Sequence, residues 1–107
     1  MILSNFKIEK VSDTFRELAA DFVHRESEHT SLITVTNFGL SRDLKTAIVF
    51  ISVYPEEKEN EVLDFLKRKA GELKQYVTEH IRTRKIPSFD FALDRGEKNR
   101  QRIDELV

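Results

Sequence analysis

The spacing of apolar residues changes along this chain from a helical period to a strand period and back. Apolar residues first recur at steps of three or four, which places them on one face of an α-helix. The residues of this stripe are Ile8, Val11, Phe15, Leu18 and Phe22. Residues 32–38 and 46–54 are then rich in β-branched and aromatic side chains, which is typical of β-strands. The pattern predicts a helix over residues 7–25 followed by two strands.

The second half of the chain returns to the helical period and ends in a third strand pattern. A long helical stretch follows Pro55 and must end before Pro87, because the residue before proline avoids the helical conformation. Gly71 lies inside this stretch and favours a break near Ala70 and Gly71. Residues 88–94 alternate between apolar and polar side chains. The predicted order is αββαβ, or αββααβ with the break, in an α+β fold with helices on one face of a three-stranded sheet.

The predicted core is a single one. The second strand is apolar on both faces, so we expect it to be central and antiparallel to the first. The expected core residues are Val11, Phe15, Leu18, Phe22, Ile33, Val35, Val49, Ile51, Leu66, Leu73, Val77 and Phe91. Ile48, Phe50 and Tyr54 share the other face of that strand. They form either an open face that stacks bases or a second core patch beneath Ile103 and Leu106.

Length and composition bound the class of protein. The chain has 107 residues, enough for one domain, with residues 95–107 as a short C-terminal extension. It contains no cysteine, which excludes disulfide scaffolds and thiolate metal sites. Its longest apolar run, residues 47–51, is far too short to span a bilayer. We expect a soluble, cytoplasmic, single-domain protein.

The sequence lacks the usual signatures of catalysis and cofactor binding. His24 and His29 are five residues apart, not the four that place two imidazoles on one helical face for zinc. The three glycines lie far apart and cannot form a phosphate-binding loop. The carboxylate pairs lie in polar runs. We therefore expect a protein that is not an enzyme and that uses no metal or other cofactor.

A basic segment interrupts a slightly acidic chain. The net charge is −1, yet residues 61–88 hold seven basic and four acidic residues. On an ideal continuous helix, Lys67 and Lys74 lie on one edge of the apolar stripe, and Glu61, Glu72 and Glu79 lie on the opposite side. The candidate RNA-binding residues are Arg42, Lys45, Lys67, Lys74, Arg82, Arg84 and Lys85. The alternative is that the last three only complement the dipole at a helix end.

The ordered motifs resemble the ribosome-binding factor A family. Residues 35–47 read VTNFGLSRDLKTA and residues 49–53 read VFISV, similar to a family pattern of strand, turn and strand. The segment AGELK at residues 70–74 resembles the family's kinked helix pair. RKIPSFDF at residues 84–91 with Asp94, and RIDEL at residues 102–106, resemble the family's closing motifs.

The resemblance implies a KH-like domain of αββααβ order without the GxxG loop that KH domains use to grip single-stranded nucleotides. It also implies a bacterial assembly factor that binds the free small (30S) ribosomal subunit and assists late maturation of 16S rRNA, above all in the cold. Such a factor is expected to be a monomer when free. The alternative is a protein–protein interaction module whose binding does not depend on RNA.

Overall fold

The computed structural model describes residues 2–27, 31–82 and 85–96. The described part of the chain has the αββααβ order that the apolar periods predict, with a short 3-10 helix, η1, before the second helix. The elements are α1 (Ile2–Glu26), β1 (Leu32–Leu40), β2 (Thr46–Tyr54), η1 (Glu56–Lys58), α2 (Glu59–Arg68), α3 (Ala70–His80) and β3 (Ser88–Leu93). The expected C-terminal helix, the expected cover from Ile103 and Leu106, and Arg84 lie outside the described residues.

The sheet has the order β1-β2-β3, so the apolar β2 is central, as predicted. β1 and β2 are antiparallel because a short turn joins them. β3 is parallel to β2, since α2 and α3 provide the crossover between them. The register pairs Thr46 with Ser88, so the segment that enters β3 lies at the same end of the sheet as the β1–β2 turn.

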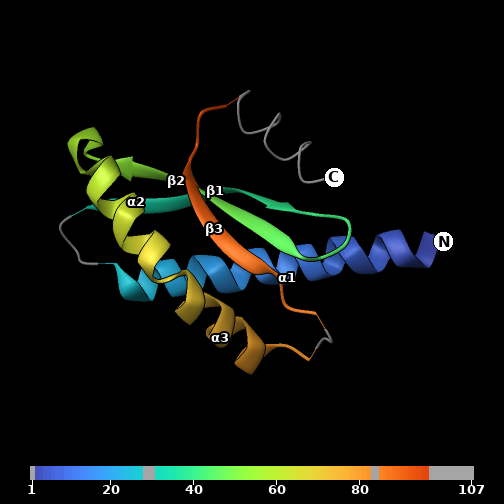
Figure 1. Ribbon diagram of the computed structural model, residues 1–107. Helices are drawn as coiled ribbons and strands as arrows, with labels where there is room; N and C mark the ends of the chain where they lie inside the picture. Colours follow the sequence, from blue (N-terminus) through green and yellow to red (C-terminus); the bar gives the residue numbers. More distant parts are fainter. Residues whose placement is uncertain (1, 28–30, 83–84, 97–107) are drawn as a thin grey trace.

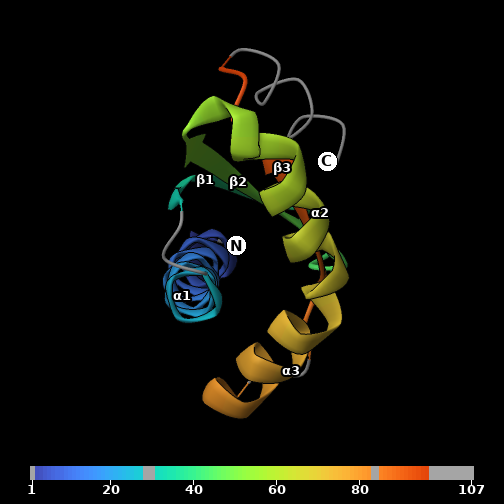
Figure 2. The same cartoon turned by 90° about the vertical axis from the view of Figure 1, so that its left-hand side faces the viewer.

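The helices lie along one face of this sheet (Figures 1 and 2). α1 contacts β1 and α3, whereas α2 and α3 both contact β3. The core between them is fully buried at Phe15, Val49 and Leu66, among others. All twelve residues expected in the core are part of it, with Val11, Leu18, Ile33 and Val35 only partly buried at its margin.

The opposite face of the sheet carries a second apolar cluster of Ile48, Phe50 and Ala92. Phe50 is only 1% exposed, so this cluster is not an open face for base stacking. Tyr54, which shares the strand face, is instead 72% exposed. Of the two alternatives for this face, the second core patch is correct for Ile48 and Phe50, whereas Tyr54 lies at the surface.

The long helical stretch is broken, as the sequence predicts, but the break lies at Lys69 rather than at Ala70 and Gly71. Lys69 has φ −93° and ψ 1°, and its N–H bonds the carbonyl of Leu66 three residues back. Gly71 lies in the first turn of α3. The tightened hydrogen bond at Lys69 ends α2, and the glycine is not what interrupts the helix.

Gly71→Ala is therefore expected to stabilise the protein by about 0.4–1 kcal/mol. A Cβ at this position meets no atom within 4 Å, and alanine loses less backbone entropy in a helix than glycine does. Urea unfolding followed by circular dichroism measures the change. A lower unfolding midpoint than the parent's would contradict the helical placement of Gly71.

The start of α1 differs from the prediction, whereas α3 ends before Pro87, as predicted. α1 begins at Ile2 rather than near residue 7. α3 ends at His80, because Ile81 is extended with φ −141° and ψ 140° and packs against the core. Within the described ranges, no helix combines the length and apolar character needed to cross a membrane.

Candidate RNA-binding surface

The turn between β1 and β2 carries two of the predicted cations. Arg42 and Lys45 are both exposed, and the turn is held from within by Ser41 and Asp43. The Asp43 carboxylate accepts hydrogen bonds from the Ser41 hydroxyl at 2.7 Å and from the Lys45 N–H at 3.0 Å. The sequence-based candidates did not include Ser41 or Asp43, although serine and aspartate at such spacing are turn-forming residues and could have indicated this network.

Lys85 joins this turn from a distant part of the chain. The Ser88 N–H donates to the Lys45 carbonyl at 2.9 Å, which ties the start of β3 to the turn. The pKa of Asp43 lies below its usual value, mainly because of the Ser41 hydrogen bond and the Lys45 N–H; the charges of Lys45 and Lys85 lower it further. Lys85 is exposed. We call Arg42, Lys45 and Lys85 the turn cluster.

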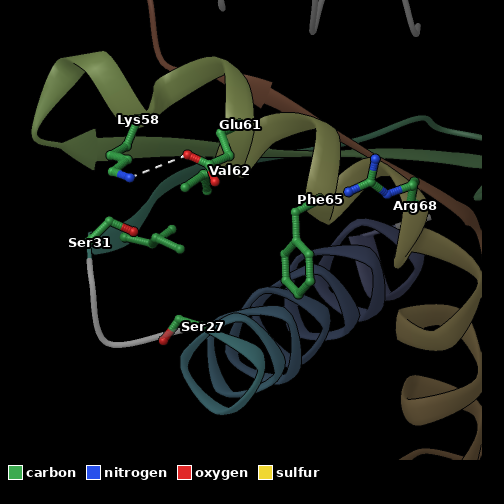
Figure 3. A pocket seen from close by; sticks show the side chains of 8 residues that line it. Ser27, Ser31, Lys58, Glu61, Val62, Phe65 and Arg68 are labelled. Atoms are coloured by element: carbon green, nitrogen blue, oxygen red, sulfur yellow. Dashed lines mark hydrogen bonds and ion pairs between the residues drawn. The ribbon is translucent and has the colours of Figure 1, made fainter.

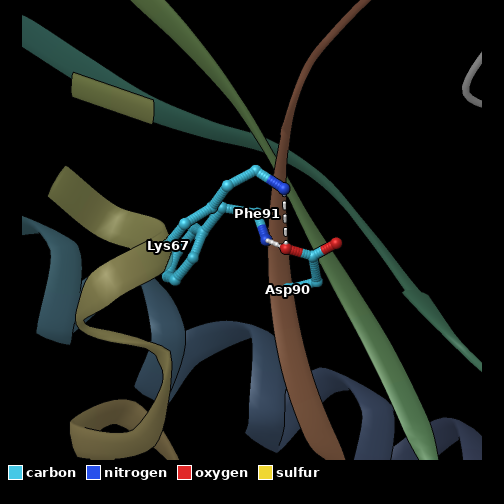
Figure 4. A network of polar contacts seen from close by, with 3 residues as sticks. All are labelled: Lys67, Asp90 and Phe91. Carbon is cyan, nitrogen blue, oxygen red and sulfur yellow. Dashed lines mark hydrogen bonds and ion pairs between the residues drawn. The ribbon is translucent and has the colours of Figure 1, made fainter. Parts of the chain in front are cut away.

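Lys67 projects from α2 toward β3, where its ammonium group lies 3.0 Å from the Asp90 carboxylate (Figure 4). The same carboxylate oxygen accepts the Phe91 N–H at 2.9 Å. Both charged side chains are close to half exposed, and such a surface pair contributes only about 0–1 kcal/mol. Because Asp90 offsets its charge, Lys67 is a weaker candidate for phosphate binding than the turn cluster.

Lys74 lies on α3, and the break at Lys69 places it on a different helix from Lys67. Their spacing of seven residues therefore does not put them on one edge, as a continuous helix would. Glu72 and Glu79 line a groove between α1 and α3. Lys74 is exposed and is not among the residues that line that groove.

Arg82 and Lys85 follow α3 rather than occupy its last turn. α3 ends at His80, and the extended, partly buried Ile81 packs against the core, so Lys85 does not lie at the helix end where the sequence predicts it. Arg84 lies outside the described residues. Arg82 follows directly on the residue that caps α3, and both cations are exposed in the connection that leads to β3.

Two hollows lie elsewhere on the surface. One, of about 230 Å³, lies between the end of α1, the start of β1 and α2, and is lined by Ser27, Phe65 and Arg68 among others (Figure 3). The groove between α1 and α3 contains Arg25, whose guanidinium lies 4.6 Å from the centre of the Tyr76 ring. Neither Arg25 nor Arg68 is among the binding residues that the sequence pattern predicts.

Nothing in residues 2–27, 31–82 and 85–96 groups acidic, histidine or cysteine side chains closely enough to hold a metal ion. His24 and His80 are exposed. His80 lies 2.7 Å from the Tyr76 carbonyl through its Nδ1 atom and against the Tyr76 ring. Both contacts of His80 are thus with Tyr76 on the same helix. His29 lies outside the described residues.

Nearly the whole chain is similar to one family of known proteins. The model of the family described as ribosome-binding factor A matches residues 7–107. Ribosome-binding factor A of Thermomicrobium roseum is 29% identical over 108 residues, which cover 98% of this chain and 84% of the relative.

Two structures of Thermus thermophilus proteins share the fold. The crystal structure of ribosome-binding factor A from this bacterium has a TM-score of 0.69 at 21% identity and covers 79% of this chain and 92% of that one. A homology model fitted into a cryo-EM map of a 30S complex has a TM-score of 0.67 at 22% identity, and covers 79% and 92% respectively. With a family model that matches nearly its whole length and the same fold, the chain belongs to the ribosome-binding factor A family.

Proposed function

We propose that this protein is a non-enzymatic ribosome biogenesis factor that binds the free 30S subunit in the bacterial cytoplasm. Family membership supports this role. One observation on the chain itself carries the proposal. The exposed Arg42, Lys45 and Lys85 lie at the same end of the sheet although the chain is slightly acidic. A homology model of the Thermus thermophilus protein has been fitted into a map of its complex with the 30S subunit, and we therefore propose the 30S subunit as the partner of this chain.

The proposed mode of binding depends on phosphates and shape rather than on base reading. The chain has no GxxG loop, so the usual KH contact with single-stranded nucleotides is missing. Cations of the turn cluster, with Lys74 and Arg82 as further exposed candidates and Arg84 from the sequence, would contact phosphates and fix the register. Lys67 contributes less because of its pairing with Asp90. No metal or nucleotide is required.

Binding of this kind assists maturation by shifting RNA conformations. A bound factor stabilises whichever conformation of 16S rRNA it contacts better, in proportion to the difference in affinity. We propose that the late, nearly mature subunit is that conformation and that the effect matters most in the cold, where misfolded RNA helices rearrange slowly. The protein would act as a monomer and leave before translation.

Co-sedimentation of the purified protein with free 30S subunits over a salt series tests this function. We expect the logarithm of the binding constant to fall linearly with the logarithm of the salt concentration. Each phosphate contact releases counterions and contributes about 0.7–0.9 to the slope of that line. Binding to 30S subunits with no salt dependence would contradict a phosphate-based interface, and absence of binding would contradict the function itself.

A protein-interaction module is the second candidate, and one observation favours it. Leu32 and Tyr54 are paired across β1 and β2, and they are 67% and 72% exposed. Exposed apolar pairs of this size are suited to a protein partner. The same salt series separates the two functions, because an apolar interface keeps its affinity when salt is raised.

A further inference from the structure

We infer that Ser41 and Asp43 are positioning residues, which hold the β1–β2 turn in one conformation so that Arg42 and Lys45 lie ready for a polyanion before it binds. The inference rests on the proposed function and deepens it. It assigns to two residues that carry no positive charge a part in binding RNA phosphates. Three observations on the turn support it.

The first observation is the burial and bonding of Ser41. It is only 2% exposed, and it is the buried polar residue of the described part of the chain. Its hydroxyl donates to Asp43 and accepts the N–H groups of Lys45 at 3.2 Å and Thr46 at 3.1 Å. One buried hydroxyl thus joins three positions around the turn, and buried polar groups are costly to leave unpaired.

The second observation is the backbone of the turn. The Ser41 N–H donates to the Thr46 carbonyl at 2.9 Å, and the Leu44 N–H donates to the Ser41 carbonyl at 3.0 Å. Leu44 has φ 62°, a left-handed conformation that is unfavourable for a residue with a side chain. Such a conformation persists only where surrounding contacts hold it, and here the hydrogen bonds at Ser41 do so.

The third observation is the negative charge of Asp43. A carboxylate between Arg42 and Lys45 repels phosphate, so its charge opposes the binding that we propose. Its oxygen, however, accepts the Ser41 hydroxyl and the Lys45 N–H. The carboxylate is thus explained by its role as an acceptor. A turn ordered in advance avoids the entropy that ordering on binding would cost.

Two variants of Asp43 separate position from charge, because both are neutral and only one of them keeps an acceptor oxygen. Asp43→Asn keeps an oxygen for the Ser41 hydroxyl, whereas Asp43→Ala does not. We expect D43N to bind free 30S subunits at least as tightly as the parent. We expect D43A to bind about tenfold more weakly than D43N, since its turn must be ordered during binding.

Co-sedimentation at fixed salt measures these affinities, and thermal unfolding confirms that both variants are folded at the assay temperature. Hydrogen exchange at the Lys45 and Thr46 amides is a second readout, expected to be faster in D43A than in D43N. Ser41→Ala should resemble D43A without any change in charge. If S41A does not fold, the Asp43 pair still decides.

The outcomes distinguish the inference from the proposed function. If the parent binds and D43A and D43N bind with equal affinity, both tighter than the parent, then Asp43 acts only by repulsion and the inference is wrong. If the parent itself does not bind 30S subunits, the proposed function fails, and the positioning role in RNA binding fails with it.

Discussion

Reversing Arg42 and Lys45 together to Glu is expected to lower the affinity for free 30S subunits about a hundredfold at about 0.1 M salt. Both side chains are exposed on a turn that internal hydrogen bonds fix. Loss of two phosphate contacts should lower the slope of the salt dependence by about 1.4–1.8, and the new carboxylates add repulsion. Co-sedimentation over a salt series measures both quantities, with circular dichroism as the folding control.

A matched control uses the other end of the sheet. Lys58 follows the end of β2, and Arg95 follows the end of β3, so both lie away from the β1–β2 turn. Each takes part in an ion pair at the surface, Lys58 with Glu61 and Arg95 with the partly buried Glu59. The double variant K58E/R95E has the same change in net charge and should keep the parent's salt slope. Equal losses in the two double variants would show that net charge alone governs binding, against a role for the turn cluster.

Truncating Phe15 to Ala is expected to cost about 3–5 kcal/mol of unfolding free energy. Its ring is fully buried and packs edge-on against Phe89 of β3, with ring centres 6.1 Å apart. This contact joins α1, the first element of the chain, to β3, the last strand. Because domains of this size are stable by about 5–15 kcal/mol, the loss is a large share of the total.

Urea unfolding of F15A, followed by circular dichroism, measures this cost. Arg16→Ala is the control, because Arg16 is the neighbouring residue on the exposed side of α1. Its substitution should change stability by less than about 0.5 kcal/mol. A parent-like unfolding midpoint for F15A would contradict the place given to Phe15 between α1 and β3.

The two predictions concern different parts of the molecule. Phe15 lies in the core that unites the helices with the sheet, whereas Arg42 and Lys45 lie in the turn at its end. R42E/K45E should therefore lose binding with little loss of stability. Any loss of binding in F15A is expected to follow its unfolded fraction. Comparison of both properties in both variants separates a binding surface from a structural core.

Local patterns in the sequence were enough to define the elements and most of the core. Helical and strand periods arise from which side of an element is buried, and that signal is local. The positions of β2 and β3, the central place of β2 and the burial of Phe22 or Leu73 could therefore be predicted from spacing and composition. The family motifs added the break in the long helical stretch, to within one residue.

Which charges come together depends instead on how the elements assemble in space. Lys85 is forty residues from Lys45 in the chain, and they become neighbours because β3 enters the sheet parallel to β2, with Ser88 beside Thr46. Exposed cations do not recur with the period of a buried face. Their spacing in the sequence therefore cannot predict where they lie after the crossover from β2 to β3. The hydrogen bonds of Ser41 are local, since its hydroxyl bonds only Asp43, Lys45 and Thr46, but that its side chain is only 2% exposed is decided by the folded structure.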